Sequence, residues 1–114
     1  MKKRLISLLF VFVMVMSLTA NAALQATRVV PTLTFSGTTA NCEAIVTDSG
    51  KVINATMELW CGSTLVDSWS GSSVSLLMLT GTHSVISGRT YTLTVSGTVG
   101  GVAFTGTPVS KTCP

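Results

Sequence analysis

The chain has 114 residues, with seven Lys and Arg, four Asp and Glu, and a formal net charge of +3. Lys2, Lys3 and Arg4 account for this excess, because the other four basic residues equal the four acidic residues in number. The rest of the chain is therefore neutral. It lacks the dense Lys and Arg clusters with which proteins neutralise phosphates, so we expect no nucleic-acid partner.

The first 22 residues have the pattern of a secretory signal peptide. An almost continuous apolar run, Leu5 to Leu18, follows the basic residues, and Ala20-Asn21-Ala22 matches a cleavage site. We therefore expect a mature N-terminus at Ala23 and a secreted, extracellular protein. The alternative is an uncleaved anchor, but a membrane-spanning helix needs about 20 apolar residues and this run is shorter. Contact with a membrane is thus expected only through this segment, if it stays uncleaved.

The composition after residue 22 is that of strands and turns. Ser and Thr make up 29 of these 92 residues, and all ten glycines lie among them. β-branched residues favour strands, while Gly, Ser and Asp favour turns. We predict an all-β domain over 30–114, after a short leader at 23–29, with no helix. The expected strands are 30–36, 40–47, 52–61, 64–70, 74–80, 90–98 and 102–110.

Three cysteines, Cys42, Cys61 and Cys113, follow the export signal. Export makes a disulfide the expected state, and we favour Cys42–Cys113, with Cys42–Cys61 as the alternative. The odd count leaves one thiol free or able to link two chains. The cysteine spacings match no zinc pattern, so neither a metal nor a cofactor is expected. The only histidine, His83, has no evident tie to a cysteine, so we predict no catalytic residues.

The hairpin after the third expected strand allows two interpretations. A tight turn at Gly62-Ser63 would create the cross-strand pairs Trp60–Leu65, Glu58–Asp67 and Thr56–Trp69. Both tryptophans, Leu65 and both carboxylates would then share an outward face that could bind sugar rings or a protein. With a turn one residue longer, Leu65, Asp67 and Trp69 would point inward and only Trp60 would stay outside. The like-charge pair of the tight turn favours the longer one.

Glu58 and Asp67 could also form a catalytic carboxylate pair or a calcium site. A catalytic pair needs a cleft, which a β domain of this size scarcely provides. Calcium binds six to eight oxygens, usually from clustered carboxylates, whereas the four acids here are scattered along the chain. We therefore expect no enzymatic activity.

The last expected hairpin turns at Gly100-Gly101, which is a strong signal for a two-residue turn. Such a turn pairs Val99 with Val102 and Gly97 with Phe104, so that the aromatic ring covers the glycine. One face of this hairpin then collects the large apolar side chains. They are Tyr91, Leu93, Val95, Val99, Val102 and Phe104.

The segment from Val85 to Val95 resembles the entry into strand F of fibronectin-III and other immunoglobulin-like bacterial modules. It has an apolar residue, a glycine and then Tyr-x-x-x-Val. The resemblance implies an immunoglobulin-like β-sandwich of about seven antiparallel strands, with Tyr91 as a tyrosine corner that holds the preceding loop. Leu93 stands where antibody domains have their second cysteine, so the usual inter-sheet disulfide is not implied.

The chain is also similar to small, uncharacterised, Ser/Thr-rich secreted bacterial proteins, which implies no particular activity. Our first expectation is a secreted, non-enzymatic binding or adhesion-type module for an unknown protein or glycan at a cell surface. The alternative is a structural or assembly subunit of an extracellular complex, in which exposed strand edges and the odd cysteine join copies.

Overall fold

The computed structural model describes residues 27–114, which form antiparallel strands and no helix. The strands are β1 (Arg28–Ser36), β2 (Thr39–Cys61), β3 (Thr64–Ser84), β4 (Thr90–Val99), β5 (Val102–Thr105) and β6 (Val109–Thr112). The prediction of an all-β domain is confirmed. The expected signal peptide and its cleavage point between Ala22 and Ala23 lie outside the described residues. Within residues 27–114 no helix is long and apolar enough to cross a membrane.

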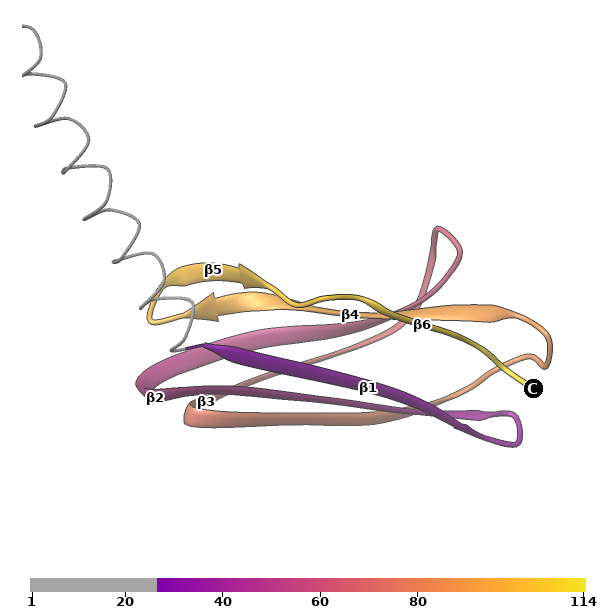
Figure 1. Ribbon diagram of the computed structural model, residues 1–114, viewed down its shortest axis with the longest axis horizontal. Helices are drawn as coiled ribbons and strands as arrows, with labels where there is room; N and C mark the ends of the chain where they lie inside the picture. Colours follow the sequence, from indigo (N-terminus) through magenta and orange to yellow (C-terminus); the bar gives the residue numbers. More distant parts are fainter. Residues whose placement is uncertain (1–26) are drawn as a thin grey trace, which may run out of the picture.

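β2 and β3 each join two of the expected strands into one long strand. They pair with each other along their whole length, with an irregularity between Asp48 and Val52. Gly50 and Ser75 both adopt positive φ angles there, 74° and 68°, and the Gly50 N–H donates to the Ser75 hydroxyl at 2.9 Å. The turn residues around Gly50 therefore mark a corner inside β2, where the hairpin folds back on itself (Figure 1).

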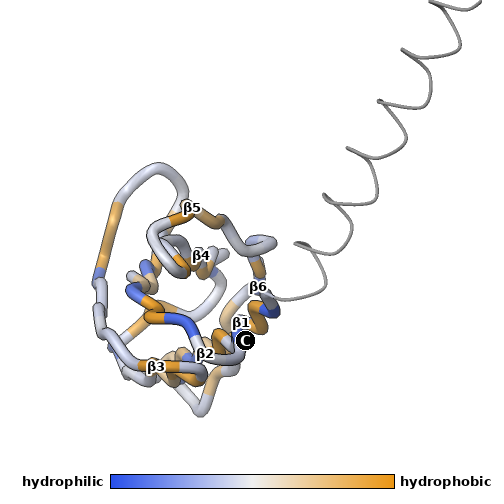
Figure 2. Tube along the Cα trace, turned by 90° about the vertical axis from the view of Figure 1, so that its left-hand side faces the viewer, coloured by the Kyte–Doolittle hydropathy of each residue, from blue (hydrophilic) through white to orange (hydrophobic). Residues whose placement is uncertain are grey.

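The corner divides a single antiparallel sheet into two layers. The first layer contains β1, residues 39–48 of β2 and residues 75–84 of β3. The second layer contains residues 52–61 of β2, residues 64–74 of β3, and β4 with its partners β5 and β6. The sheet is thus curled, and the two layers face each other, as the views from the side and along the long axis show (Figures 1 and 2).

The core lies between the layers because side chains alternate along each strand. Inward positions of both layers are apolar and fully buried. They include Leu33, Ala44, Val46, Ile53, Met57, Leu59 and Leu93. Burying one such large aliphatic side chain contributes roughly 1.5–3 kcal/mol to stability. The rings of Phe35 and Tyr91, with centroids 6.1 Å apart, add an aromatic contact between β1 and β4.

The loop between β3 and β4 is held by Tyr91 and by the C-terminal segment. The buried Tyr91 hydroxyl accepts a hydrogen bond of 2.9 Å from the Ile86 N–H, five residues earlier. The Gly88 N–H donates to the Cys113 carbonyl at 2.8 Å, and the Cys113 N–H donates to the Arg89 carbonyl at 2.9 Å. These three bonds fix the loop against the start of β4.

The last hairpin has the expected register, with Val99 opposite Val102 and Gly97 opposite Phe104. The large apolar side chains of this hairpin are not all buried, because Val102 lies at its tip and is 71% exposed. The expected final strand is also split into β5 and β6. Pro108, which has no N–H to donate, lies in the gap between them and so cannot continue the ladder.

The expected disulfides are not formed, since Cys42, Cys61 and Cys113 are all unpaired. Cys42 points into the core from the middle of the first layer, where it lies opposite Leu33. Cys113 is buried instead at the turn between β1 and β2, with its Sγ 3.6 Å from the Gly37 carbonyl oxygen. Cys42 lies three residues, about 10 Å along β2, beyond Thr39, which is the first residue after that turn. A disulfide needs Cα atoms within about 7 Å, so the Cys42–Cys113 pairing is wrong for this fold.

Candidate functional site

Both interpretations of the tryptophan hairpin hold in part. The turn is tight, with Gly62 at a φ of 60° and Trp60 opposite Leu65. The register then shifts by one residue, so that Leu59 faces Asp67. Such a shift is a β-bulge, with two residues, Leu65 and Val66, opposite Trp60. A bulge, and not a longer turn, therefore changes which side chains face outward.

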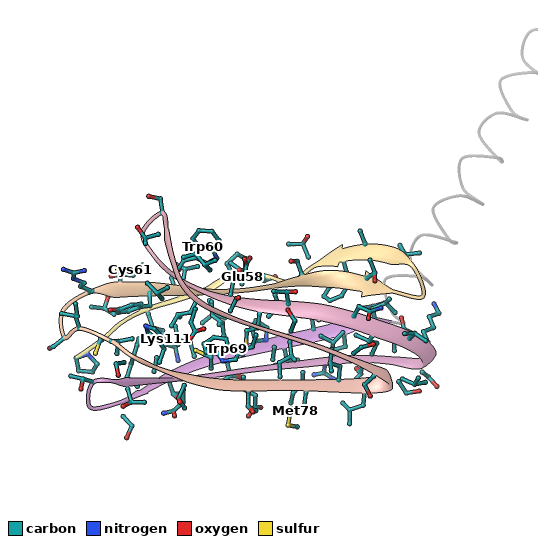
Figure 3. All side chains as sticks on the ribbon, turned by 180° about the vertical axis from the view of Figure 1, so that it is seen from behind. Glu58, Trp60, Cys61, Trp69, Met78 and Lys111 are labelled. Carbon is teal, nitrogen blue, oxygen red and sulfur yellow. The ribbon has the colours of Figure 1, made fainter. Side chains whose placement is uncertain are left out.

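The bulge separates the five side chains that the tight turn would have gathered. Trp60, Glu58 and Leu65 lie on the outer side of the second layer, and Leu65 is 45% exposed. Asp67 and Trp69 lie opposite Leu59 and Met57, whose side chains are fully buried, and so point between the layers. Figure 3 shows Trp60 and Glu58 above the upper layer and Trp69 between the layers.

The outer surface of the second layer is covered by hydroxyl groups around one tryptophan. Its residues are Asn54, Thr56, Glu58 and Trp60 of β2, Ser68, Ser70 and Ser72 of β3, and Thr92, Thr94, Ser96 and Thr98 of β4. We call this surface the Trp60 face. Thr56 and Ser70 share a hydrogen bond of 2.9 Å across the strands. The side chains are therefore small, polar and partly ordered by one another.

The indole of Trp60 is fixed in position on this face. Its Nε1–H donates to the Thr94 hydroxyl at 3.3 Å. Thr94 is the direct partner of Glu58, so the indole leans along β4 towards that carboxylate. Within residues 27–114, no ion pair engages Glu58. The result is an aromatic ring beside an available carboxylate, in a field of hydroxyls.

A shallow hollow of about 510 Å³ continues the Trp60 face away from the indole. It is lined by Asn54, Ala55, Thr56, Ser70, Gly71, Ser72, Gly97 and Thr98. The outward side chains here are small, which leaves room over the backbone. The ring, the carboxylate and the hollow thus follow one another along β2, which suits an extended ligand.

Asp67 belongs to a different cluster, between the layers. Its Oδ2 lies 3.0 Å from Nδ1 of His83, near the other end of the same strand. Burial, and then the Asp67 carboxylate, raise the pKa of the Cys42 thiol to about 11. Nothing in the linear sequence connects these three residues, because only the corner in β3 brings residues 67 and 83 together. A thiol with this pKa stays protonated at neutral pH and is a poor nucleophile.

The outer surface of the first layer carries a contiguous apolar patch that the sequence analysis did not predict. It contains Val30, Ile45, Leu76 and Met78, which we call the apolar face. Leu76 and Met78 are 52% and 55% exposed. Along β3 they alternate with the buried Leu77 and Leu79. Because both sets are apolar, the period-two pattern does not distinguish the inner from the outer side.

Within residues 27–114, no group of three or more His, Cys, Asp and Glu side chains is arranged to hold a metal ion. No model of a known protein family matches this chain, and no curated protein sequence matches it. What the two outer faces can bind therefore has to be inferred from their own chemistry.

Proposed function

We propose that this chain is a secreted, non-enzymatic binding module of the immunoglobulin-like class that recognises a glycan through the Trp60 face. The arrangement of the layers supports the fold class, with β1, β2 and β3 on one side and β3, β2, β4 and β5–β6 on the other. The hydrogen bond from the Ile86 N–H to the Tyr91 hydroxyl supports it further, because immunoglobulin-like domains use a tyrosine in this way.

The observation that carries the proposal is the indole of Trp60, partly exposed and held by Thr94. Sugar rings present an apolar face of C–H groups together with a rim of hydroxyls. A fixed aromatic ring can stack on the apolar C–H face of the sugar, and Thr and Ser hydroxyls can exchange hydrogen bonds with the sugar hydroxyls. Because the ring is already positioned, little side-chain entropy is lost when a ligand binds.

The charge of the face narrows the class of glycan. Glu58 is its only ionisable side chain, so the face is neutral apart from one carboxylate. Sulfated, phosphorylated or uronic-acid-rich chains would be repelled by it. A neutral or amino-substituted glycan chain fits best, and several units could extend from the indole into the hollow at Gly71 and Gly97.

Two features support a non-enzymatic role. Glu58 and Asp67 lie on opposite sides of the second layer, so they cannot act as a pair on one substrate. The Cys42 thiol is buried and has a raised pKa, which disfavours it as a nucleophile.

An array of immobilised neutral, amino-substituted and acidic oligosaccharides tests the proposal with the product of the full chain. We expect binding to neutral or amino-substituted chains, and a loss of about tenfold or more in Trp60→Ala, since one stacked aromatic ring contributes on the order of 1–2 kcal/mol. Trp69→Phe is the matched control, because that indole points between the layers. Equal binding by wild type and Trp60→Ala, or no binding on a broad array, would contradict the proposal.

The second candidate is a subunit of an extracellular assembly linked through a cysteine. The observation that favours it is the position of Cys61, a partly exposed, unpaired thiol next to the turn at Gly62-Ser63. Gel mobility without and with reductant tests it. A disulfide-linked dimer that is absent in Cys61→Ser would support this candidate, and a single monomer band under both conditions would exclude it.

A further inference from the structure

The apolar face lies on the layer opposite to the Trp60 face and needs its own explanation. Three of its four side chains are well exposed, from 39% at Val30 to 52% at Leu76 and 55% at Met78. Figure 3 shows Met78 projecting away from the lower layer, on the side that no strand covers. The largest contiguous apolar patch on a soluble protein is often a contact surface.

The register across β1, β2 and β3 arranges this surface in rows. The central row is Val30, Ile45 and Met78, which lie directly opposite one another. The outward-facing row on one side of it contains Arg28. The outward-facing row on its other side contains Glu43, which pairs with Thr32. Within residues 27–114, neither of these charges has an ion-pair partner. The apolar row is therefore flanked by one positive and one negative side chain, each without a partner.

We propose that the apolar face is the interface of a homodimer, in which two copies pack layer against layer about a two-fold axis. The axis runs across the strands, through the Val30–Ile45–Met78 row. Each central side chain then lies over the same side chain of the second copy. This operation also exchanges the two flanking rows, so Arg28 of each copy lies beside Glu43 of the other.

The charges distinguish this arrangement from the other simple one. A two-fold axis parallel to the strands, along the central strand β2, would place each row over the same row of the second copy. Glu43 would then face Glu43 of the second copy, which is unfavourable. Packed sheets are about 10 Å apart. Arg and Glu side chains extending from both sheets can bridge that gap. The self-complementary surface that a two-fold dimer requires is thus already present on one chain.

The size of the whole outer surface of the first layer, polar rows included, is compatible with a dimer of modest affinity. Its three strands lie about 4.8 Å apart, each has nine residues or more at about 3.3 Å, and the surface spans about 14 by 30 Å. Two such surfaces bury on the order of 1,000 Å² in total, near the lower limit for a specific interface. We therefore expect an equilibrium between monomer and dimer that depends on protein concentration.

Sedimentation velocity of the full-chain product, with a reductant present to exclude disulfide-linked species, measures this equilibrium. We expect a reversible dimer whose association constant falls at least about tenfold in Met78→Lys. Leu76→Lys is a second variant in case the first folds poorly. Val102→Lys is the matched control, because Val102 is also apolar and exposed, at 71%, but lies on the β4–β5 hairpin. Its dimer should be as stable as that of the wild type.

Charge exchange tests the symmetry. Arg28→Glu and Glu43→Arg should each weaken the dimer about tenfold or more, and the double variant should recover to within a few fold of the wild type. A protein that stays monomeric into the submillimolar range overturns the proposal. So does a dimer that tolerates Met78→Lys and Leu76→Lys. Failure of the double variant to recover overturns the crossed two-fold arrangement.

Discussion

The indole of Trp69 lies directly over Gly81, twelve residues further along the same strand. The two residues belong to different layers, because β3 passes from one layer to the other at the corner. Gly81 has no side chain, and the ring occupies the space that a Cβ would fill. This contact joins the two parts of β3 across the layers, and it holds the Trp69 indole between the layers, away from the Trp60 face.

Gly81→Ala should therefore destabilise the fold. The new methyl group would overlap the indole, and displacing the ring should lower the free energy of unfolding by about 2 kcal/mol, as expected for an overpacked site. Chemical denaturation measures the change. Thr82→Ala, next in sequence and exposed on the outer side, is the control and should stay within about 0.5 kcal/mol of wild type. If Gly81→Ala is as stable as that control, the close contact does not exist in solution.

Gly97→Ala should be more harmful than Gly81→Ala. A Cβ at Gly97 would overlap the backbone carbonyl of Asn54 on the neighbouring strand, and a paired backbone cannot move aside as a side chain can. We expect a loss of about 3 kcal/mol or more, or failure to fold. Ser96→Ala, one residue earlier on the Trp60 face, should cost little in the same denaturation experiment. Equal stability of the two variants would contradict the close strand approach.

Cys42 should make the stability of the protein depend on alkaline pH. Burial, together with the Asp67 carboxylate, raises its pKa from 9.0 to about 11 in the folded state. An unfolded thiol ionises near its ordinary value, so between about pH 9 and 11 the unfolded state releases a proton that the folded state retains. The free energy of unfolding should consequently fall as the pH rises through this range, by on the order of 2 kcal/mol.

Urea denaturation of the wild type and Cys42→Ala across this pH range isolates the effect, because other groups titrate equally in both proteins. The free energy of unfolding of the wild type should fall relative to that of Cys42→Ala as the pH rises from about 9 to 11. Asp67→Asn should make the change smaller, since it removes the second cause of the raised pKa. Parallel curves for wild type and Cys42→Ala would show that the thiol has an ordinary pKa.

Tyr91→Phe should remove the hydrogen bond that the Ile86 N–H donates, while the ring keeps its buried position. We expect a loss of about 1 kcal/mol, which is typical of one neutral hydrogen bond. Amide hydrogen exchange provides the specific measurement, since protection should fall at Ile86 more than in the middle of β2. Unchanged protection of Ile86 in Tyr91→Phe would mean that the loop is held in another way.

Most strand segments could be predicted because each is short, locally alternating and bounded by Gly, Ser or Asp. The Gly100-Gly101 hairpin could be predicted in register as well, since a two-residue turn permits only one pairing. The tryptophan hairpin could not, because a bulge at Leu65 and Val66 follows a correctly expected turn. A bulge depends on how the strand packs against the rest of the sheet, and a local pattern does not specify it.

The amino-acid sequence by itself determined the all-β class, the neutral and hydroxyl-rich character of the domain, and the outward position of Trp60. These follow from composition and from the period-two alternation of side chains, which are local properties. The tertiary structure alone decided that Asp67 meets His83, that Trp69 covers Gly81, and that the cysteines stay apart. Each of these depends on the corner at Gly50 and Ser75, which folds one long hairpin over itself and brings together residues that are distant along the chain.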